Sequence, residues 1–309
     1  MTQGNAGNGR TILITGARGF IGRAVQKLLR QSGCNVLPVD QAASVPGSGH
    51  FSVGREILLD ITQLEQLKSL FSAREIAGIV HLAAILPTAA RQDPLRATEV
   101  NVTGSLNLLE MAREFGVRRF VFGSSLSIYG TCPAEQVVSE TNRAAPEDLY
   151  GAAKLYVEQL GQIYADCHGI EFVTLRIGRV VGPGAKSTSS AWRSEIFEFL
   201  QSDHPAKITV PYVASERILL VHVNDAAKAL VGLVQASHPG QTVYNAPCES
   251  VIVEELRQLV EGLNPNLTIE LGDRYATGNP RLLDCTRFQN EFGLQTEPIL
   301  DQLKNAAEK

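Results

Sequence analysis

Short runs of β-branched and apolar residues alternate along the chain with longer amphipathic stretches, and this alternation limits the possible folds more than any other feature. The first run is Thr11 to Thr15, and an amphipathic stretch from Phe20 to Gln31 follows it. Such alternation is typical of parallel strands joined by crossover helices. The pattern continues with predicted strands at 36–39, 57–59, 78–82, 119–122 and 171–177, and predicted helices at 64–71, 95–115 and 148–165.

The alternation weakens after residue 182, where a Gly/Ser/Thr-rich loop over 182–190 begins. Shorter predicted elements follow, with helices near 192–200, 225–235, 253–263 and 299–307 and strands at 207–211 and 218–221. We therefore predict an α/β fold, a Rossmann-type doubly wound parallel sheet with a smaller C-terminal α/β substrate lobe. The first domain is predicted over residues 1–177, completed by roughly 215–245, and the discontinuous lobe over 178–309.

Composition excludes several classes of protein. The chain has 309 residues, 44% apolar and 19% charged, with a formal net charge of -4, so it can form a packed core and lacks a basic surface for nucleic acid or an anionic membrane. No stretch approaches the length of a membrane span, and the five cysteines form no C-x-x-C pair. We expect a soluble, cytoplasmic protein with a frayed N-terminus, reduced thiols, no metal site and a small-molecule partner.

Glycines at every third position, Gly16, Gly19 and Gly22, separate the first predicted strand from the first predicted helix. Without side chains the backbone can approach a pyrophosphate, and the helix N-terminus supplies N–H groups and partial positive charge. This spacing indicates dinucleotide binding, although an ordinary tight turn can have the same glycines.

Acidic residues at the ends of the next two strands strengthen that prediction. Asp40 follows the turn by about 20 residues, where a carboxylate accepts hydrogen bonds from ribose hydroxyls and repels a 2'-phosphate, which favours NAD over NADP. Arg18 argues the other way, because a guanidinium can pair with a 2'-phosphate. Asp60 is placed either to meet the adenine amino group or to cap a helix that begins at Ile61.

Tyr150 and Lys154 lie one turn apart on a predicted helix and therefore share a face. A neighbouring ammonium and a positive nicotinamide ring both favour the phenolate, so we expect a lowered pKa for Tyr150. The phenolate can then accept a proton from a secondary alcohol whose carbon loses hydride. The pair alone can also arise by chance as a surface pair.

Two hydroxyls, Ser124 and Ser125, end the predicted strand that precedes this helix. Open parallel sheets bind ligands at the carboxyl ends of their strands, so Ser125 is placed to hydrogen-bond the same substrate oxygen as Tyr150. The alternative for both serines is a capped turn.

In combination these segments resemble the extended short-chain dehydrogenase/reductase family, which contains sugar-nucleotide epimerases and dehydratases. The resemblance also rests on Asp60-Ile61, His81-Leu-Ala-Ala84, Asn101-Val-Thr-Gly104, Ser124 to Gly130 and Leu175-Arg176. It implies NAD as the cofactor, a structural His81, and a homodimer built from the helices at 95–115 and after Tyr150. It implies cofactor contacts by Gly16, Gly19, Phe20, Ile21, Gly22, Asp40, Asp60, Ile61, Leu82, Ala83, Ala84, Tyr150 and Lys154, and catalysis by Ser125, Tyr150 and Lys154.

Two departures from the family pattern narrow the expected function. Family dehydratases carry an Asp-Glu pair after the catalytic hydroxyl, whereas this chain has Leu126 and Ser127, which argues against sugar dehydration. Family epimerases commonly have an Asn where this chain has Arg179, and a guanidinium there can bind a substrate carboxylate or phosphate, or form an ion pair.

Other candidates for substrate binding lie in the second half of the chain. Arg217 and Arg281 resemble phosphate-binding arginines, although each can equally be a surface or salt-bridging residue. Trp192 and Arg193 belong to a segment over 187–195 that can cover the substrate, although a lone Trp more often belongs to a core. The candidate substrate contacts are therefore Ser125, Ser127, Arg179, Trp192 and Arg217.

Three functions are compatible with these residues. The first is an NAD-dependent dehydrogenase that oxidises or reduces a secondary alcohol or ketone of a sugar, sugar acid or related polyol. The alternative is a nucleotide-sugar 4-epimerase of the UDP-hexose type with tightly bound NAD. A non-catalytic dinucleotide-binding protein is disfavoured, because Ser125, Tyr150 and Lys154 are all retained. We expect the dehydrogenase because Arg179 replaces the amide of the epimerases.

Overall fold

The computed structural model describes residues 9–41, 56–185 and 190–308. They form two units, each assembled from three segments. Unit 1 comprises the described parts of Met1–Ser124, Ala152–Leu175 and Ala227–Val243, and unit 2 comprises those of Ser125–Gly151, Arg176–Ala226 and Tyr244–Lys309. The expected fraying of the N-terminus and the middle of the 182–190 loop lie outside the described residues.

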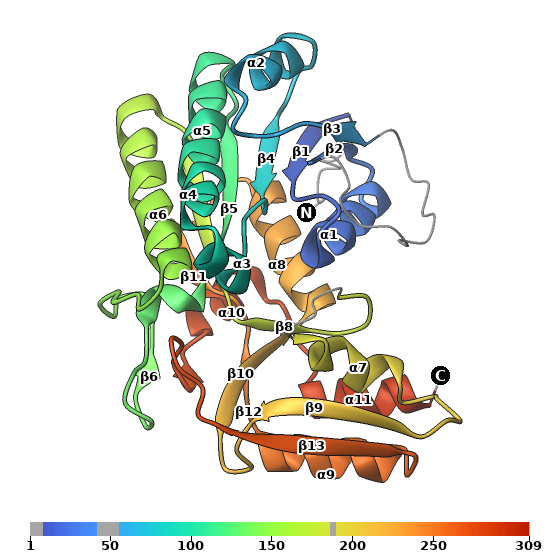
Figure 1. Cartoon of the computed structure of the whole chain (residues 1–309). Coiled ribbons are helices and arrows are strands. Elements are labelled where there is room, and N and C mark those ends of the chain that lie inside the picture. Colours follow the sequence, from blue (N-terminus) through green and yellow to red (C-terminus); the bar gives the residue numbers. More distant parts are fainter. Residues whose placement is uncertain (1–8, 42–55, 186–189, 309) are drawn as a thin grey trace. The chain divides into compact units, whose positions relative to one another are not determined.

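The sheet of unit 1 has seven strands in the order β11-β7-β5-β4-β1-β2-β3 (Figure 1). Strands β2 and β3 lie on one side of β1, and the later strands β4, β5, β7 and β11 lie on the other side. This order confirms the doubly wound α/β fold predicted from the sequence. The strands are parallel, and the central ones are fully buried, as in Leu13 and Ile79. Their bounds are β1 (Thr11–Thr15), β2 (Asn35–Asp40), β3 (Ile57–Leu58), β4 (Gly78–His81), β5 (Arg119–Ser125), β7 (Glu171–Ile177) and β11 (Val243–Asn245).

Helices cover both faces of this sheet (Figure 1). On one face α2 (Leu64–Ser72), α5 (Gly104–Glu114) and α6 (Leu149–His168) contribute Leu67, Leu108 and Val157 to a core with the phenylalanines of β5 and β7. On the other face lie α1 (Phe20–Gln31) and α8 (Val223–Gln235), where Gln235 Nε2 donates to Ser32 Oγ at 2.7 Å. The sheet is therefore buried on both sides.

The single helix predicted over 95–115 is divided. After α3 (Pro87–Gln92) come α4 (Pro94–Thr98), a π-helical segment (Glu99–Thr103) and then α5. In the π segment the Asn101 amide accepts from the Ile85 N–H at 2.7 Å and donates to the Ile85 carbonyl at 2.9 Å. The local widening thus ties the helix to the loop after β4, a feature that apolar periodicity does not reveal.

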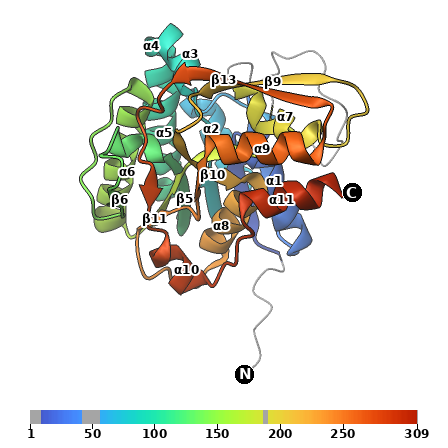
Figure 2. The ribbon, with the colours of Figure 1, turned by 90° about the horizontal axis from the view of Figure 1, so that it is seen from below.

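Unit 2 contains three small sheets, in the orders β12-β10-β8, β13-β9 and β14-β6. Figure 2 shows β9 and β13 side by side near α9, and their apolar side chains join those of α7, α9 and α11 in one core. Residues 125–151, which the sequence-based division assigned to the first domain, group with unit 2, where β6 pairs with β14. The bounds are β6 (Val137–Val138), β8 (Arg179–Val181), α7 (Trp192–Glu198), β9 (Ala206–Tyr212), β10 (Arg217–His222), β12 (Glu249–Ile252), α9 (Val253–Leu263), β13 (Leu267–Arg274), β14 (Leu282–Leu283), α10 (Thr286–Phe292) and α11 (Ile299–Ala307).

Within the described residues, no helix combines the length and the apolar character needed to cross a membrane.

Candidate active site

The glycine-rich turn between β1 and α1 packs closely against the loop that follows β4. Gly16 has φ of 66°, and a Cβ on it would lie 2.7 Å from the Ala83 nitrogen. A Cβ on Gly22 would lie 2.2 Å from the Gly16 carbonyl oxygen. Because side chains are excluded here and α1 begins at Phe20, the turn presents bare backbone and helix N–H groups, the features that a pyrophosphate requires. Gly19, Phe20 and Ile21 lie at this helix start as predicted.

Asp40 lies at the end of β2 beside the turn. Its Oδ2 accepts from the Arg18 N–H at 2.7 Å and its Oδ1 from the Gln41 N–H at 2.8 Å. The Arg18 guanidinium pairs with Glu56 through Nε at 2.7 Å. Glu56 was not predicted. Its carboxylate neutralises the Arg18 guanidinium, which had argued for binding of a 2'-phosphate.

His81 at the end of β4 positions the loop containing Leu82, Ala83 and Ala84. The Leu82 and Ala83 N–H groups donate to Thr15 Oγ1 at 3.3 and 3.2 Å, and this oxygen lies 2.6 Å from His81 Nδ1. Burial, reinforced by the positive charge of Lys154, lowers the pKa of His81 to about 3. His81 is therefore a neutral structural residue, as expected.

Asp60 and Ile61 make contacts within unit 1 that the sequence did not reveal. Asp60 Oδ1 accepts from the Thr62 N–H at 3.0 Å and Oδ2 pairs with Arg96. Although burial opposes them, these hydrogen bonds hold the pKa of Asp60 below its usual value. The alternative of a helix N-cap is wrong, because α2 begins at Leu64 and has Gln63 as its N-cap. Ile61 is buried against Gly104.

Ser125 and Tyr150 are brought together within unit 2, where their hydroxyls share a hydrogen bond. Ser125 Oγ also donates to Ser127 Oγ at 3.0 Å and accepts from the Ser127 N–H at 3.1 Å. Gly151 permits this approach, because a Cβ on it would lie 2.6 Å from the Ser127 carbonyl oxygen. Ser125 therefore both caps a turn and contacts the phenol, and Ser127 lies beside it.

The pKa of Tyr150 differs from the sequence-based expectation. Burial raises it to about 12, the negative charge of Asp148 adds to the rise, and only the Ser125 hydroxyl opposes it. The expected lowering by Lys154 is wrong for the protein alone, because burial of the phenol dominates. Tyr150 is consequently a protonated phenol at neutral pH.

Lys154, one turn further along α6, is buried in unit 1. Its Nζ donates to the Gly123 carbonyl at 2.7 Å and lies 4.5 Å from the Phe122 ring centroid. Burial lowers the pKa of Lys154 to about 7, and the carboxylate of Glu158 opposes this. Glu158 accepts from Ser124 Oγ at 2.5 Å, so Ser124 is a structural residue. Sequence reasoning missed Glu158, although its spacing four residues after Lys154 is a signal.

The remaining candidates lie in unit 2. Arg179 Nε donates to Tyr212 Oη at 3.2 Å. Trp192 is buried in the core with its ring centroid 6.4 Å from that of Tyr212. It is therefore a core residue, the alternative given for it above. Arg217 begins β10, and its backbone N–H donates to Glu216. Arg281 pairs with the same buried Glu216 at 2.6 Å, which confirms its salt-bridging alternative.

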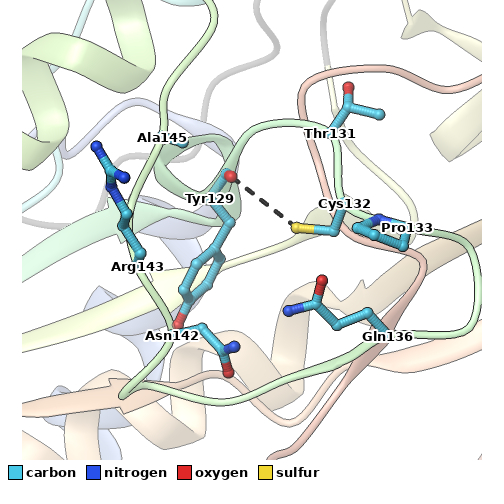
Figure 3. A pocket seen from close by; sticks show the side chains of 8 residues that line it. All are labelled: Tyr129, Thr131, Cys132, Pro133, Gln136, Asn142, Arg143 and Ala145. Atoms are coloured by element: carbon cyan, nitrogen blue, oxygen red, sulfur yellow. Dashed lines mark hydrogen bonds between the residues drawn. The ribbon is translucent and has the colours of Figure 1, made fainter.

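Unit 2 also has an open pocket, and none of the candidate site residues lines it (Figure 3). Its tyrosine hydroxyl is already bonded to Asn245 at 2.8 Å, and burial raises the pKa of its cysteine, Cys132. The tyrosine hydroxyl is therefore already engaged, and the thiol is favoured in its protonated form. The lining residues are Tyr129, Thr131, Cys132, Pro133, Gln136, Asn142, Arg143 and Ala145. The described residues also contain no group of three or more His, Cys, Asp or Glu side chains suited to a metal.

Comparison with known proteins identifies the family. Residues 12–246 match the NAD dependent epimerase/dehydratase family. The chain belongs to this family. Its curated relatives in the family include a UDP-glucuronate 4-epimerase of Thermodesulfobacterium geofontis, 31% identical over 213 residues that cover 63% of each chain. They also include a UDP-glucose 4-epimerase of Lacticaseibacillus casei, 33% identical over 56% of this chain. The chain matches 63% and 52% of the lengths of these two epimerases.

A solved structure of MoeE5 in complex with UDP-glucuronic acid and NAD is 27% identical and superposes with a TM-score of 0.79 over 96% of this chain and 98% of MoeE5. The epimerase/dehydratase fold found here is thus shared along nearly the whole chain.

Proposed function

We propose that this chain is an NAD-dependent oxidoreductase that oxidises or reduces a secondary alcohol or ketone of a sugar, sugar acid or related polyol. The observation that carries the proposal is the hydrogen-bonded pair of hydroxyls on Ser125 and Tyr150, with Lys154 one helical turn beyond. Membership of a family described as NAD dependent supports it, as does NAD in the MoeE5 complex.

The turn of unit 1 fits a dinucleotide, because its packing excludes side chains at Gly16 and Gly22. Gly16, Gly19, Gly22 and the first N–H groups of α1 would hold the pyrophosphate, and the Asp40 carboxylate would accept from the adenosine ribose. The pairing of Arg18 with Glu56 supports NAD over NADP. When bound, NAD supplies the hydride acceptor and a positively charged ring.

The chain's own residues then hold and move one proton. Ser125 Oγ and Tyr150 Oη hold the substrate oxygen between them. In reduction Tyr150, protonated because its pKa is about 12, donates its proton to the ketone oxygen. In oxidation the phenol must first release its proton to solvent, which the positive charges of the ring and of Lys154 favour. The phenolate then accepts the proton of the substrate hydroxyl.

The alternative is a UDP-hexose 4-epimerase, which oxidises its substrate and returns the hydride to the other face. The two curated relatives named above favour it. Arg179, at the position where epimerases commonly carry an amide, favours the dehydrogenase.

The first experiment measures the NAD or NADH released per chain when protein purified without added cofactor is denatured. Near-stoichiometric release supports the epimerase, and an empty protein that binds NAD reversibly supports the dehydrogenase. A screen of sugar acids, polyols and UDP-hexoses for NADH formation or epimerised product then identifies the reaction.

Tyr150→Phe is expected to lower kcat/KM by at least about 100-fold, because the hydroxyl that transfers the proton is lost. Tyr275→Phe, which changes an exposed tyrosine of unit 2, is the matched control and keeps full activity. Turnover by Tyr150→Phe close to that of the control would contradict the mechanism.

A homodimer and a cytoplasmic location complete the proposal. The dimer is supported by exposed Tyr156 and Ile163 on α6, and the location by the five free cysteines of the chain.

A further inference from the structure

Two guanidinium groups from separate elements of unit 2 converge on one tyrosine. Arg179 begins β8 and Arg193 is the second residue of α7. Arg179 Nε donates to Tyr212 Oη at 3.2 Å, and its guanidinium carbon lies 5.6 Å from the Tyr212 ring centroid. Burial, then the positive charge of Arg179, lower the pKa of Arg193, and Tyr212 opposes them. The Arg193 carbonyl accepts from the Gly182 N–H at 3.0 Å, so the start of α7 lies against the end of β8, the strand that Arg179 begins. The two cations are therefore near each other and repel.

Neither cation has a carboxylate partner within the part of the chain that the structure describes. Arg193 Nε is fully buried and has no hydrogen-bond partner among those residues. The buried Arg119, by contrast, pairs with Glu171 at 2.6 Å, and the partly buried Arg281 pairs with Glu216 at 2.6 Å. A charge removed from water without a counter-ion is costly, so two neighbouring guanidinium groups without a carboxylate partner favour the binding of an anion.

The pair also lies close in the fold to the proposed catalytic hydroxyl. Gly178, directly before Arg179, packs against Leu126, directly after Ser125: a Cβ on Gly178 would lie 3.2 Å from Leu126 Cδ1. A ligand held by the arginines is thereby kept near the residues that would act on its hydroxyl group.

We propose that Arg179 and Arg193 together bind an oxyanion that is part of the substrate, a carboxylate or a phosphoryl group, while Tyr212 orients Arg179. This inference rests on the proposed function and adds a charged end to the substrate. Guanidinium forks suit such groups because they donate two parallel hydrogen bonds to oxygens of one anion. Arg193, which comes from α7, supplies the second guanidinium.

The kinetic test compares the wild type with Arg179→Gln and Arg193→Gln. Its substrates are glucuronate and galacturonate, which have a carboxylate and no phosphate, and UDP-glucose and UDP-galactose, which have phosphates and no carboxylate. For the class that binds, each variant is expected to raise KM by about tenfold to a hundredfold with little change in kcat, the effect of losing charge-assisted hydrogen bonds. A KM effect confined to the sugar acids identifies a carboxylate, and one confined to the UDP-sugars identifies phosphate.

Anion binding is measured separately, so that failure of the proposed function leaves this inference decidable. Sulfate stabilises proteins in general, so the readout is the difference between variants. Sodium sulfate, titrated at constant ionic strength against sodium chloride, is expected to raise the Tm of the wild type by more than that of the double variant Arg179→Gln/Arg193→Gln. Arg257→Gln, which removes a surface arginine of α9 paired with Glu254, is the control and responds to sulfate as the wild type does.

Removal of Arg193 is also expected to change the Tm of the protein. Because its charge is buried beside another cation, Arg193→Met is expected to raise Tm without sulfate, whereas a structural arginine would lower it. Arg193→Lys, which keeps the charge and loses the fork, verifies that the site folds and recovers part of the sulfate response. Unchanged KM values for all four substrates, or an equal sulfate response in the double variant, would overturn the inference.

Discussion

At the scale of single residues, protonation of the buried His81 imidazole is coupled to the stability of unit 1. Ser105 Oγ donates to the Asn101 carbonyl at 2.7 Å and therefore accepts from His81 Nε2–H at 2.8 Å. The other ring nitrogen, Nδ1, then accepts from the Thr15 hydroxyl at 2.6 Å. A second proton on the ring would break this last hydrogen bond and bury a charge beside Lys154.

This arrangement predicts acid sensitivity. The pKa of His81 is about 3 in the folded protein and 6.5 for a solvent-exposed histidine, so its contribution is complete above pH 6.5 and is lost as the pH falls toward 3. Between these values the free energy of unfolding should fall by about 1.4 kcal/mol per pH unit from this group. Denaturant unfolding at several pH values measures it. His81→Asn, less stable at neutral pH, should have a shallower slope, and identical slopes would refute the assignment.

At the scale of elements, the junction of β1 and α1 depends on the absence of one methyl group. Gly22→Ala would place a Cβ 2.2 Å from the Gly16 carbonyl oxygen. We expect a loss of about 1–3 kcal/mol in unfolding free energy, because backbone must move, together with weaker NAD binding. Thermal unfolding and NAD titration measure the two effects.

Gly262→Ala is the matched control, since Gly262 lies in helix α9 and a Cβ there meets nothing within 4 Å. It should stabilise the protein by about 0.5–1 kcal/mol through helix propensity. Equal effects of the two substitutions would mean that the turn adapts to a side chain.

Elements with a strong period were predicted well from the sequence, and those fixed by distant partners were not. The predicted first strand and first helix match β1 and α1 residue for residue. The strand β13 was missed, because it is half exposed and is defined by its pairing with β9, about 60 residues earlier in the chain. The π-helical segment was missed because it depends on the contact of Asn101 with Ile85.

The residues of the candidate site were likewise predicted only in part. The serine, tyrosine and lysine were found from spacing along one strand and one helix, and the hydrogen bond of Ser125 with Tyr150 follows from it. The partners Glu56 and Arg96 were not found, because charge pairing across 38 or 36 residues leaves no periodic signal. Glu158 was overlooked although it lies one helical turn after Lys154. The pKa of Tyr150 was misjudged because burial is a property of the packed structure.

At the scale of the whole molecule, the outer face of α6 predicts self-association. Tyr156 and Ile163 are 50% and 55% exposed and lie on one side of the helix, as their spacing of seven residues requires. If this face forms the dimer, Ile163→Glu should convert the dimer to a monomer, because a buried unpaired charge is costly at an interface.

Light scattering coupled to size exclusion measures the mass of the wild type and the variant. Gln289→Glu, which adds the same charge to an exposed position on α10, should leave the mass unchanged. A monomeric wild type, or a dimer that survives Ile163→Glu, would show that this face is not the interface.

The edge strand β11 has a consequence for how the protein is made. The other strands of the unit 1 sheet all end by Ile177, whereas β11 is synthesised later. Its approach to β7 is held by the Thr174 N–H, which donates to the Thr242 carbonyl at 2.8 Å. On the ribosome, β7 is therefore synthesised long before its edge partner and has an unpaired edge while unit 2 residues up to Ala226 emerge. Translation thus leaves an interval in which that edge of the nascent sheet has no strand to pair with.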